Sequence, residues 1–227
     1  MSLKHLFDIR YNLTMIKLAA FLGNPGPEYA KNRHNAGRML AAALPFYPSL
    51  FWHKKFNGLY ALYESCHFIM PETYMNLSGN SVQTAAAFFK IKVDEIIVIH
   101  DELELPLGTL SLKFSGGLGG HNGLRSMKNC FGNADFWRLR IGLGRPDSRL
   151  PGEGGPAGSG EGIIDWVLAD FSKTEREILD PTLEAGADLL MQVLSGDPET
   201  LLKKWAKKKI QIPAKEEITE AQETESK

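Results

Sequence analysis

Glu95-Ile-Ile-Val-Ile-His100 is the strongest candidate for a buried strand in this chain of 227 residues. The run is short and almost entirely apolar, which is typical of a strand covered on both faces of a sheet. A second apolar run, Met15-Ile-Lys-Leu-Ala-Ala-Phe-Leu22, stops at the turn-forming Gly23-Asn24-Pro25-Gly26. We therefore expect two buried strands, each followed directly by polar residues.

Strand and helix signals alternate on either side of these two runs. Further strands are predicted over residues 56–63, 66–70, 110–114 and 137–143, and helices over residues 35–44 and 76–90. Ser172 and Glu175 have the spacing of a capping box, which predicts the start of another helical region. We expect Pro181 to interrupt or restart that helix. The alternation, with a hairpin-like pair among the strands, predicts an α/β fold around a mixed sheet.

One domain over residues 15–210 is expected to contain most of the chain. Residues 1–14 are interpreted as an N-terminal extension. Residues 145–162 are dense in Gly, Pro and Ser, which predicts a long mobile loop with an insert at about 147–162. Residues 211–227 are predicted to be a disordered charged tail.

The composition excludes several classes of protein. The chain is 43% hydrophobic and has a formal net charge of -1, so it lacks the strongly basic signature of many nucleic-acid binders. Cys66 and Cys130 have no Cys-x-x-Cys partner, which argues against a disulfide framework and against a zinc site. The sequence also lacks a signal-peptide core and a long apolar run. We expect a cytoplasmic protein that does not span a membrane.

Polar residues cluster in three loops that follow strand signals. Asn24 and His34 follow the first strand, His100-Asp101-Glu102 ends the second, and His121-Asn122 follows a glycine-rich stretch. Ligands of α/β sheets usually bind in the crevice beyond the strand ends. These three loops are therefore expected to form one site.

The sequences of these loops do not match the motifs of several common functional sites. Asn122 stands where the third glycine of a dinucleotide-binding fingerprint should fall, and no Gly-Lys-Ser/Thr follows. Ser78 lacks the glycine that precedes the serine of a nucleophile elbow. A metal held by His100-Asp101-Glu102 is disfavoured because adjacent strand residues point to opposite faces. What remains is a histidine base oriented by a carboxylate, with asparagine amides that orient the substrate and stabilise an oxyanion.

Four blocks of sequence between residues 15 and 146 resemble the bacterial-type peptidyl-tRNA hydrolase family. They are Leu22-Gly-Asn-Pro-Gly-Pro-Glu-Tyr29 with Arg33-His-Asn-Ala-Gly37, Pro71-Glu-Thr-Tyr-Met-Asn-Leu-Ser-Gly79, Val98-Ile-His-Asp-Glu-Leu-Glu-Leu-Pro-Leu-Gly108 through Gly119-Gly-His-Asn-Gly-Leu124, and Arg138-Leu-Arg-Ile-Gly-Leu-Gly-Arg-Pro146. The resemblance implies a three-layer α/β/α domain around a twisted mixed sheet. It also implies a cytoplasmic monomer that cleaves peptidyl-tRNA without a cofactor or metal.

The resemblance also implies roles for individual residues. His34 is expected to be the general base and Asp101 to fix its tautomer, with Asn24 as a third catalytic group. Residues expected to bind the substrate or the tRNA are Tyr29, Tyr74, Met75, Asn76, His121, Asn122, Lys113, Arg138 and Arg140. His100 is interpreted as a structural residue that makes a local hydrogen bond.

Other interpretations of these residues remain open. Met75 also fits core packing, and Asn24 and Asn76 also fit a turn and a helix cap. The lysines from Lys203 to Lys209 fit either a solvated face or an extension of the tRNA-binding patch. A non-catalytic RNA-binding module and a cofactor-free esterase of small molecules are the alternative functions, and an intact His34 argues against the first.

Overall fold

The computed structural model describes residues 15–146 and 160–211. The proposed extension at 1–14, most of the predicted insert and nearly all of the proposed tail lie outside these residues. Within them, no helix is long and apolar enough to span a bilayer.

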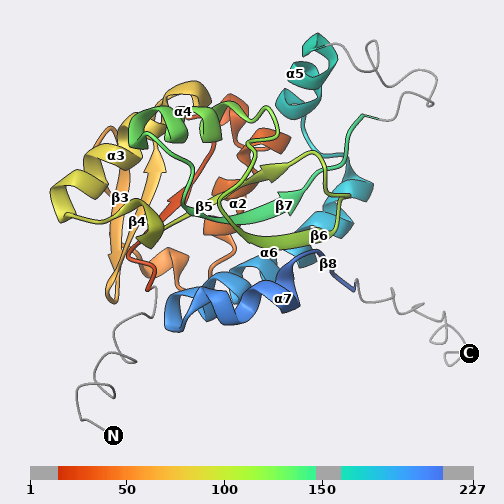
Figure 1. Cartoon of the computed structure of the whole chain (residues 1–227). Coiled ribbons are helices and arrows are strands. Elements are labelled where there is room, and N and C mark those ends of the chain that lie inside the picture. Colours follow the sequence, from red (N-terminus) through yellow and green to blue (C-terminus); the bar gives the residue numbers. More distant parts are fainter. Residues whose placement is uncertain (1–14, 147–159, 212–227) are drawn as a thin grey trace, which may run out of the picture.

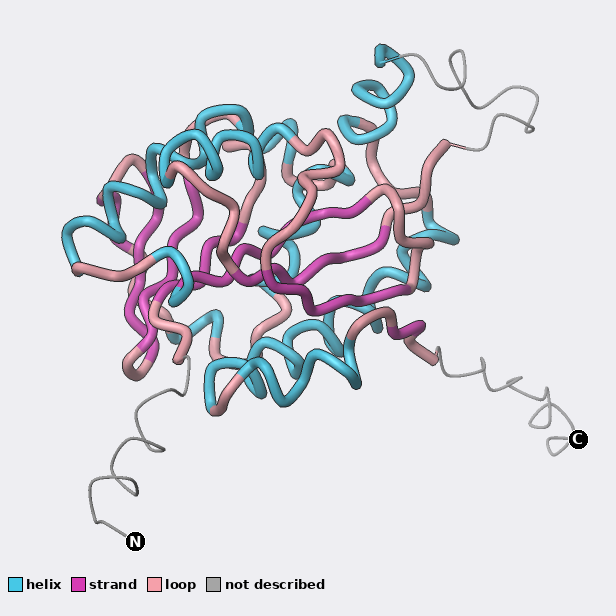
Figure 2. The backbone as a smooth tube through the Cα atoms, in the orientation of Figure 1, coloured by secondary structure: helices cyan, strands magenta, loops and turns pink. Residues whose placement is uncertain are grey.

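The chain forms one eight-stranded sheet with helices on both faces (Figures 1 and 2). The strands are β1 (Leu18–Phe21), β2 (His53–Lys55), β3 (Gly58–Tyr63), β4 (Cys66–Pro71), β5 (Ile96–Glu102), β6 (Thr109–Phe114), β7 (Trp137–Gly142) and β8 (Lys208–Lys209). The α-helices are α2 (Ala36–Ala42), α3 (Ser78–Phe89), α4 (Asn122–Phe131), α5 (Gly160–Leu168), α6 (Lys173–Ser195) and α7 (Leu202–Trp205). The short 3-10 helices are η1 (Pro27–Tyr29), η2 (Arg33–Asn35), η3 (Tyr47–Ser49), η4 (Met75–Leu77), η5 (Val93–Glu95) and η6 (Pro198–Leu201).

The strand order is β2-β3-β4-β1-β5-β7-β6-β8. The four central strands β4, β1, β5 and β7 are parallel, whereas β2, β3, β6 and β8 add antiparallel edges. The predicted mixed sheet is thereby confirmed. The carboxyl ends of β1 and β5 lie next to each other, so the loops that follow them meet at one edge of the sheet.

The two faces of the sheet bury two separate cores. Ile97 and Ile99 of β5 point into a first core, which also contains residues of α2, α6 and α7. Ile96 and Val98 point into a second core, which contains residues of α3 and α4. This alternation explains why β5 is apolar at every position from 96 to 99, because both of its faces are covered. The predicted three-layer α/β/α architecture is correct.

Two predictions about the C-terminal half were wrong. Residues 160–162 belong to helix α5 and not to a loop. Helix α6 runs without interruption through Pro181, although proline removes one helical hydrogen bond. Leu179, Leu183 and Leu190 of this helix are fully or almost fully buried, and burial of each leucine stabilises the fold by about 1.5–3 kcal/mol. Together these contacts outweigh the cost of the proline, which is about 3 kcal/mol.

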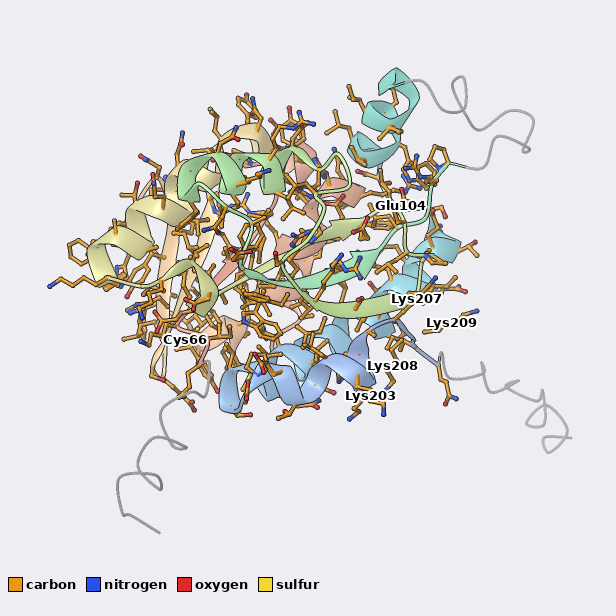
Figure 3. The ribbon with its side chains drawn as sticks, viewed as in Figure 1. Cys66, Glu104, Lys203, Lys207, Lys208 and Lys209 are labelled. Atoms are coloured by element: carbon orange, nitrogen blue, oxygen red, sulfur yellow. The ribbon has the colours of Figure 1, made fainter. Side chains whose placement is uncertain are left out.

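The last described residues lie along the free edge of the sheet. After α7, the segment carrying Lys207, Lys208 and Lys209 pairs with β6 through the two-residue strand β8. Figure 3 shows Lys207 and Lys209 at this edge, with Lys203 farther away beneath helix α7. Trp205 is 4% exposed and anchors the segment in the first core.

Candidate active site

The 3-10 helix η2, directly before helix α2, brings His34 to the end of strand β5. Gly37 allows this approach, because a Cβ at this position would lie 2.5 Å from the carbonyl oxygen of Ile99 and 2.6 Å from that of Leu22. Such distances are too short for any side chain. The absence of a side chain at Gly37 therefore lets the turn that carries His34 rest directly on β1 and β5, next to Asp101.

His34 and Asp101 form a buried pair. His34 Nδ1 lies 2.9 Å from Asp101 Oδ1, and the two residues are 8% and 3% exposed. Burial lowers the pKa of His34, but the charge and hydrogen bond of Asp101 raise it above its usual value. Burial likewise raises the pKa of Asp101, yet the two neighbouring histidines hold it well below its usual value. Asp101 is therefore ionised and accepts the Nδ1 proton, which leaves the lone pair of neutral His34 on Nε2.

His121 is a second histidine on the same carboxylate oxygen. Its Nε2 lies 3.0 Å from Asp101 Oδ1, and its Nδ1 accepts hydrogen bonds from the backbone N–H groups of Gly123 and Leu124, which begin helix α4. A nitrogen that accepts from two N–H donors carries no proton. The proton of neutral His121 is therefore on Nε2, and it donates to Asp101.

The same geometry bears on metal binding. The ligand atoms of His34, Asp101 and His121 lie within 4.8 Å of one another, so this cluster has the residue types of a metal site. However, Nε2 of His121 carries a proton and has no free lone pair for a cation. The cluster is built as a hydrogen-bond network in which one carboxylate oxygen accepts from two imidazoles.

His100 does not join this network. Its side chain is 1% exposed and its Nδ1 bonds to the carbonyl oxygen of Asp101 at 2.6 Å. Burial and the neighbouring His121 lower its pKa well below the usual value. The prediction that His100 makes a local structural hydrogen bond is confirmed.

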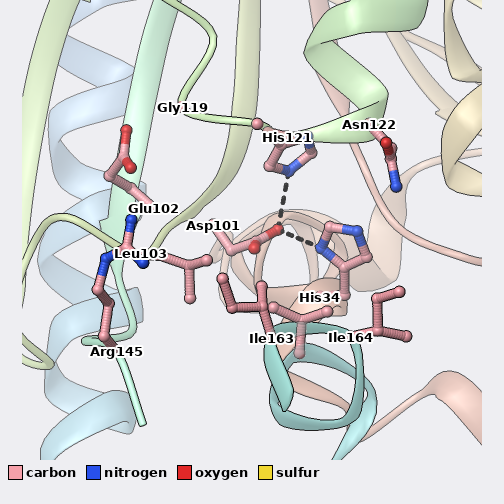
Figure 4. Close-up of a pocket in the computed structure, with 12 residues that line it drawn as sticks. His34, Asp101, Glu102, Leu103, Gly119, His121, Asn122, Arg145, Ile163 and Ile164 are labelled. Atoms are coloured by element: carbon pink, nitrogen blue, oxygen red, sulfur yellow. Dashed lines mark hydrogen bonds and ion pairs between the residues drawn. The ribbon is translucent and has the colours of Figure 1, made fainter. Parts of the chain in front are cut away.

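A cavity of about 250 Å³ opens in front of the pair. Figure 4 shows the second ring nitrogen of His34 on the side that faces Asn122. The other lining residues come from β5 and the loop after it, the glycine-rich loop, the segment after β7 and helix α5. They include Glu102, Leu103, Gly119, Gly120, Arg145, Ile163, Ile164 and Val167. The cavity thus has a polar wall at His34 and an apolar wall on α5, a helix whose contribution the sequence did not predict.

Asn24 does not line this cavity, but hydrogen bonds fix both its side chain and its backbone. Its Oδ1 accepts the backbone N–H of Met75 at 2.8 Å, so the opposite end of its amide is the donor Nδ2. Asn35 bonds to both the N–H and the C=O of Asn24, at 2.8 and 3.0 Å, and Arg38 adds a bond to the same C=O at 2.9 Å. Sequence reasoning gave Asn35 and Arg38 no role, although Asn35 stands within a quoted motif.

The remaining predicted substrate contacts differ in whether they line the cavity. Asn122 lines it and accepts a hydrogen bond from Arg125 at 3.3 Å. Asn76 and Tyr74 are exposed, and Tyr29 is half-buried; these three do not line the cavity. Met75 is 4% exposed and belongs to the second core, which fits the core-packing interpretation, and its role as a wall of the site stays a prediction.

The three predicted phosphate contacts on β6 and β7 differ in accessibility. Arg138 is 1% exposed and donates to the carbonyl oxygens of Gly116 and Gly117 at 2.7 Å, and its role as a tRNA contact stays a prediction. It fixes the glycine-rich loop. Arg140 is partly buried, with bonds to Glu102 and Ser111. Lys113 is half-buried beside these residues.

Arg33 has a structural role that the sequence did not reveal. It is 5% exposed, it forms two hydrogen bonds with the carboxylate of Glu175, at 2.9 and 2.8 Å, and its guanidinium stacks 3.7 Å above the Trp166 ring. It also donates to the carbonyl oxygen of Asp170 at 2.9 Å. Arg33 therefore ties the turn that carries His34 to helices α5 and α6.

Several known proteins are similar to this chain in sequence and in structure. Residues 18–213 match the family model described as peptidyl-tRNA hydrolase. A peptidyl-tRNA hydrolase of Treponema pallidum (strain Nichols) is 42% identical over 207 residues, covering 86% of this chain and 96% of the relative. A peptidyl-tRNA hydrolase crystallised with N-propanol is 31% identical with a TM-score of 0.75, and one from Acinetobacter baumannii is 31% identical with a TM-score of 0.73. Each structure covers 86% of this chain and is itself 96% covered. The chain therefore belongs to the peptidyl-tRNA hydrolase family of enzymes.

Proposed function

We propose that this protein hydrolyses the ester between a peptide and the 3′-terminal ribose of tRNA, with His34 as the general base. The observation that carries the proposal is the bond between His34 Nδ1 and Asp101 Oδ1 at 2.9 Å. It leaves Nε2 as the basic atom at the cavity, within reach of a water molecule placed there. The reaction would free tRNA from peptidyl-tRNAs released by ribosomes and so serve translation.

The reaction proceeds in two proton transfers. His34 Nε2 removes a proton from water while the water oxygen attacks the ester carbonyl carbon, and Asp101 stabilises the imidazolium that forms. The tetrahedral intermediate then collapses, the bond to the ribose oxygen breaks, and the leaving oxygen takes the proton from His34. The products are a tRNA with a free 3′ end and a peptide carboxylic acid, which then loses its proton to the solvent.

Asparagine amides would stabilise and orient the substrate. Nδ2 of Asn24 is a neutral donor whose partner atom Oδ1 is already occupied by the Met75 N–H. A fixed donor of this kind can bind a developing oxyanion without a rearrangement. Asn76 and Asn122 are proposed to bind the peptide backbone or the ribose, because neutral amides offer both donors and acceptors. Tyr29, Tyr74 and the fixed His121 complete the proposed substrate contacts.

The proposed tRNA contacts lie on the sheet next to the site. Lys113 and Arg140 are assigned to phosphate groups, which would position the acceptor end. We further propose that the protein acts as a cytoplasmic monomer without a cofactor or metal.

The proposal is tested by offering wild-type protein two substrates in the presence of a chelator. One is N-acetyl-aminoacyl-tRNA and the other is a simple ester of the same N-acetyl amino acid. We expect release from the tRNA, with a KM that rises steeply with salt, and little cleavage of the simple ester. Cleavage of both with equal efficiency and no salt dependence would favour an esterase of small molecules.

A further inference from the structure

Five lysines crowd the last described segment of the chain. Residues 203–209 contain Lys203, Lys204, Lys207, Lys208 and Lys209, in a chain whose formal net charge is only -1. None of the five forms an ion pair with another described residue. The segment is therefore a local concentration of positive charge that the folded domain leaves unneutralised.

The backbone of this segment is fixed at several points. Trp205 is buried, the hydroxyl of Ser111 donates to the carbonyl oxygen of Ala206, and the N–H of Ile210 donates to the carbonyl oxygen of Gly108 at 2.8 Å. Lysines on a fixed backbone lose less conformational freedom when they bind a partner. The segment is thus better prepared for binding than a flexible tail.

The lysines separate onto two sides of the sheet. Lys209 is the direct partner of Thr109 in the β6–β8 pair, so both side chains point to the same face. Lys113, four residues along β6, points to that face too because side chains alternate. Lys208 is paired with Leu110 of the first core, and its Nζ lies 4.4 Å from the Trp205 ring. Lys209 therefore points to the Lys113 face, and Lys207, two residues before it, is exposed at the same edge of the sheet (Figure 3).

This face leads directly to the active site. Arg140 shares the face with Ser111, to which it is bonded at 2.8 Å, and its other terminal nitrogen lies 3.3 Å from Glu102, which lines the cavity. Leu110 and Leu112, on the opposite side of β6, pack in the first core with residues of α6 and α7. Strand β8 is three strands from β5, which corresponds to about 14 Å at the usual strand spacing.

We propose that Lys207 and Lys209 bind the phosphate backbone of the tRNA at a distance from the scissile ester. This inference rests on the proposed function, because the 3′ end must occupy the cavity for the acceptor arm to cross β7, β6 and β8. Together with Lys113 and Arg140, the two lysines would extend the tRNA-binding cations from the site to the edge of the sheet. They contact phosphates and add affinity without reading the sequence of the tRNA.

A structural role at the sheet edge is the competing explanation. Lysines are common on edge strands because they prevent pairing with other chains, and β8 is the edge strand here. An edge role predicts that loss of Lys207 and Lys209 increases aggregation but leaves tRNA affinity unchanged. A phosphate role predicts the reverse.

The test compares two double variants of equal charge. The first is Lys207→Gln with Lys209→Gln, and the control is Lys203→Gln with Lys204→Gln on helix α7. For each, kcat and KM are measured with N-acetyl-aminoacyl-tRNA and with a short substrate that carries the same ester on only the terminal trinucleotide. Binding of deacylated tRNA is measured at several salt concentrations, and aggregation by light scattering.

For the first variant we expect KM for the full tRNA substrate to rise about tenfold at low salt, with kcat unchanged. The slope of log affinity against log salt should fall by about 2, one for each lost phosphate contact. The trinucleotide substrate and the control variant should behave like wild type. An unchanged KM and salt slope, or an equal loss in the control, would overturn the proposal. If wild type releases nothing from either substrate, the proposed function itself fails.

Discussion

Asp101→Asn removes the charge that faces His34 while it preserves the size of the side chain and one accepting oxygen. In wild type, burial lowers the pKa of His34, and the charge and hydrogen bond of Asp101 raise it above the usual value of 6.5. In the variant the burial remains and the charge is gone, so the pKa should fall below 6.5. Because only neutral His34 accepts a proton, activity is lost as the pH falls through this pKa.

Two changes follow for the pH profile of kcat/KM. The acid limb, which lies above pH 6.5 in wild type, should move below pH 6.5 in the variant. The plateau should fall by about 10² to 10⁴, since a weaker base with an unfixed tautomer remains. This loss corresponds to about 3–5 kcal/mol of transition-state stabilisation.

Hydrolysis of N-acetyl-aminoacyl-tRNA measured across the pH range tests both changes. Glu102→Gln is the matched control, because Glu102 lines the same cavity but does not bond to His34. Its acid limb should stay where the wild-type limb lies. An Asp101→Asn enzyme with the wild-type limb and most of its activity would refute the assignment of Asp101.

Three further predictions concern residues that hold the site in place. His121→Ala should lower the free energy of unfolding in urea by about 0.5–2 kcal/mol, because the cap of helix α4 is lost. His121→Asn should keep the cap and still lower kcat. Equal kcat values for His121→Asn and wild type would contradict a role of His121 in the hydrogen-bond network of Asp101. Gly37→Ala should destabilise the fold by about 1–3 kcal/mol. Gly117→Ala is the control and should not destabilise it, because a Cβ at Gly117 has no neighbour within 4 Å. Similar melting temperatures for the two variants would be inconsistent with the close approach of Gly37 to strands β1 and β5. Glu175→Gln should cost about 1.5–3 kcal/mol at neutral pH through its bonds to Arg33. Burial raises the pKa of Glu175, but its bonds to Arg33 and to Ser172 lower it below its usual value, so its contribution is present above that value and is lost as the pH falls; a deficit that persists at acid pH would argue against the pair.

Much of the sheet was predictable because its central strands are buried. β1, β4 and β5 are almost wholly buried, and the runs of apolar residues that this requires end at turn residues. Strand β2 is exposed at all three positions and β8 has only two residues. Neither carries an apolar pattern, since each is held by pairing with a neighbour. Such strands cannot be predicted from their own sequence, because they form only by pairing with a neighbouring strand.

The candidate site shows a similar division. The motifs around His34 and Asp101 predicted the pair, and the structure brings the two side chains together. The register of the strands, which local sequence does not encode, decided the rest. Arg138 is opposite Lys113 in the β6–β7 pair, yet it is turned to the glycine-rich loop and buried, because its guanidinium satisfies two loop carbonyls. The bond from His121 to Asp101 likewise depends on how the loop folds back.

The central claim is that His34 is the base in hydrolysis of peptidyl-tRNA. The most direct test measures release of labelled N-acetyl-aminoacyl groups from tRNA by wild type and His34→Ala, with chelator present and tRNA binding measured in parallel. We predict chelator-resistant release by wild type, and a loss of about 10² to 10⁴ in the variant with unchanged tRNA affinity. A variant that binds tRNA and retains most of its activity would contradict the account.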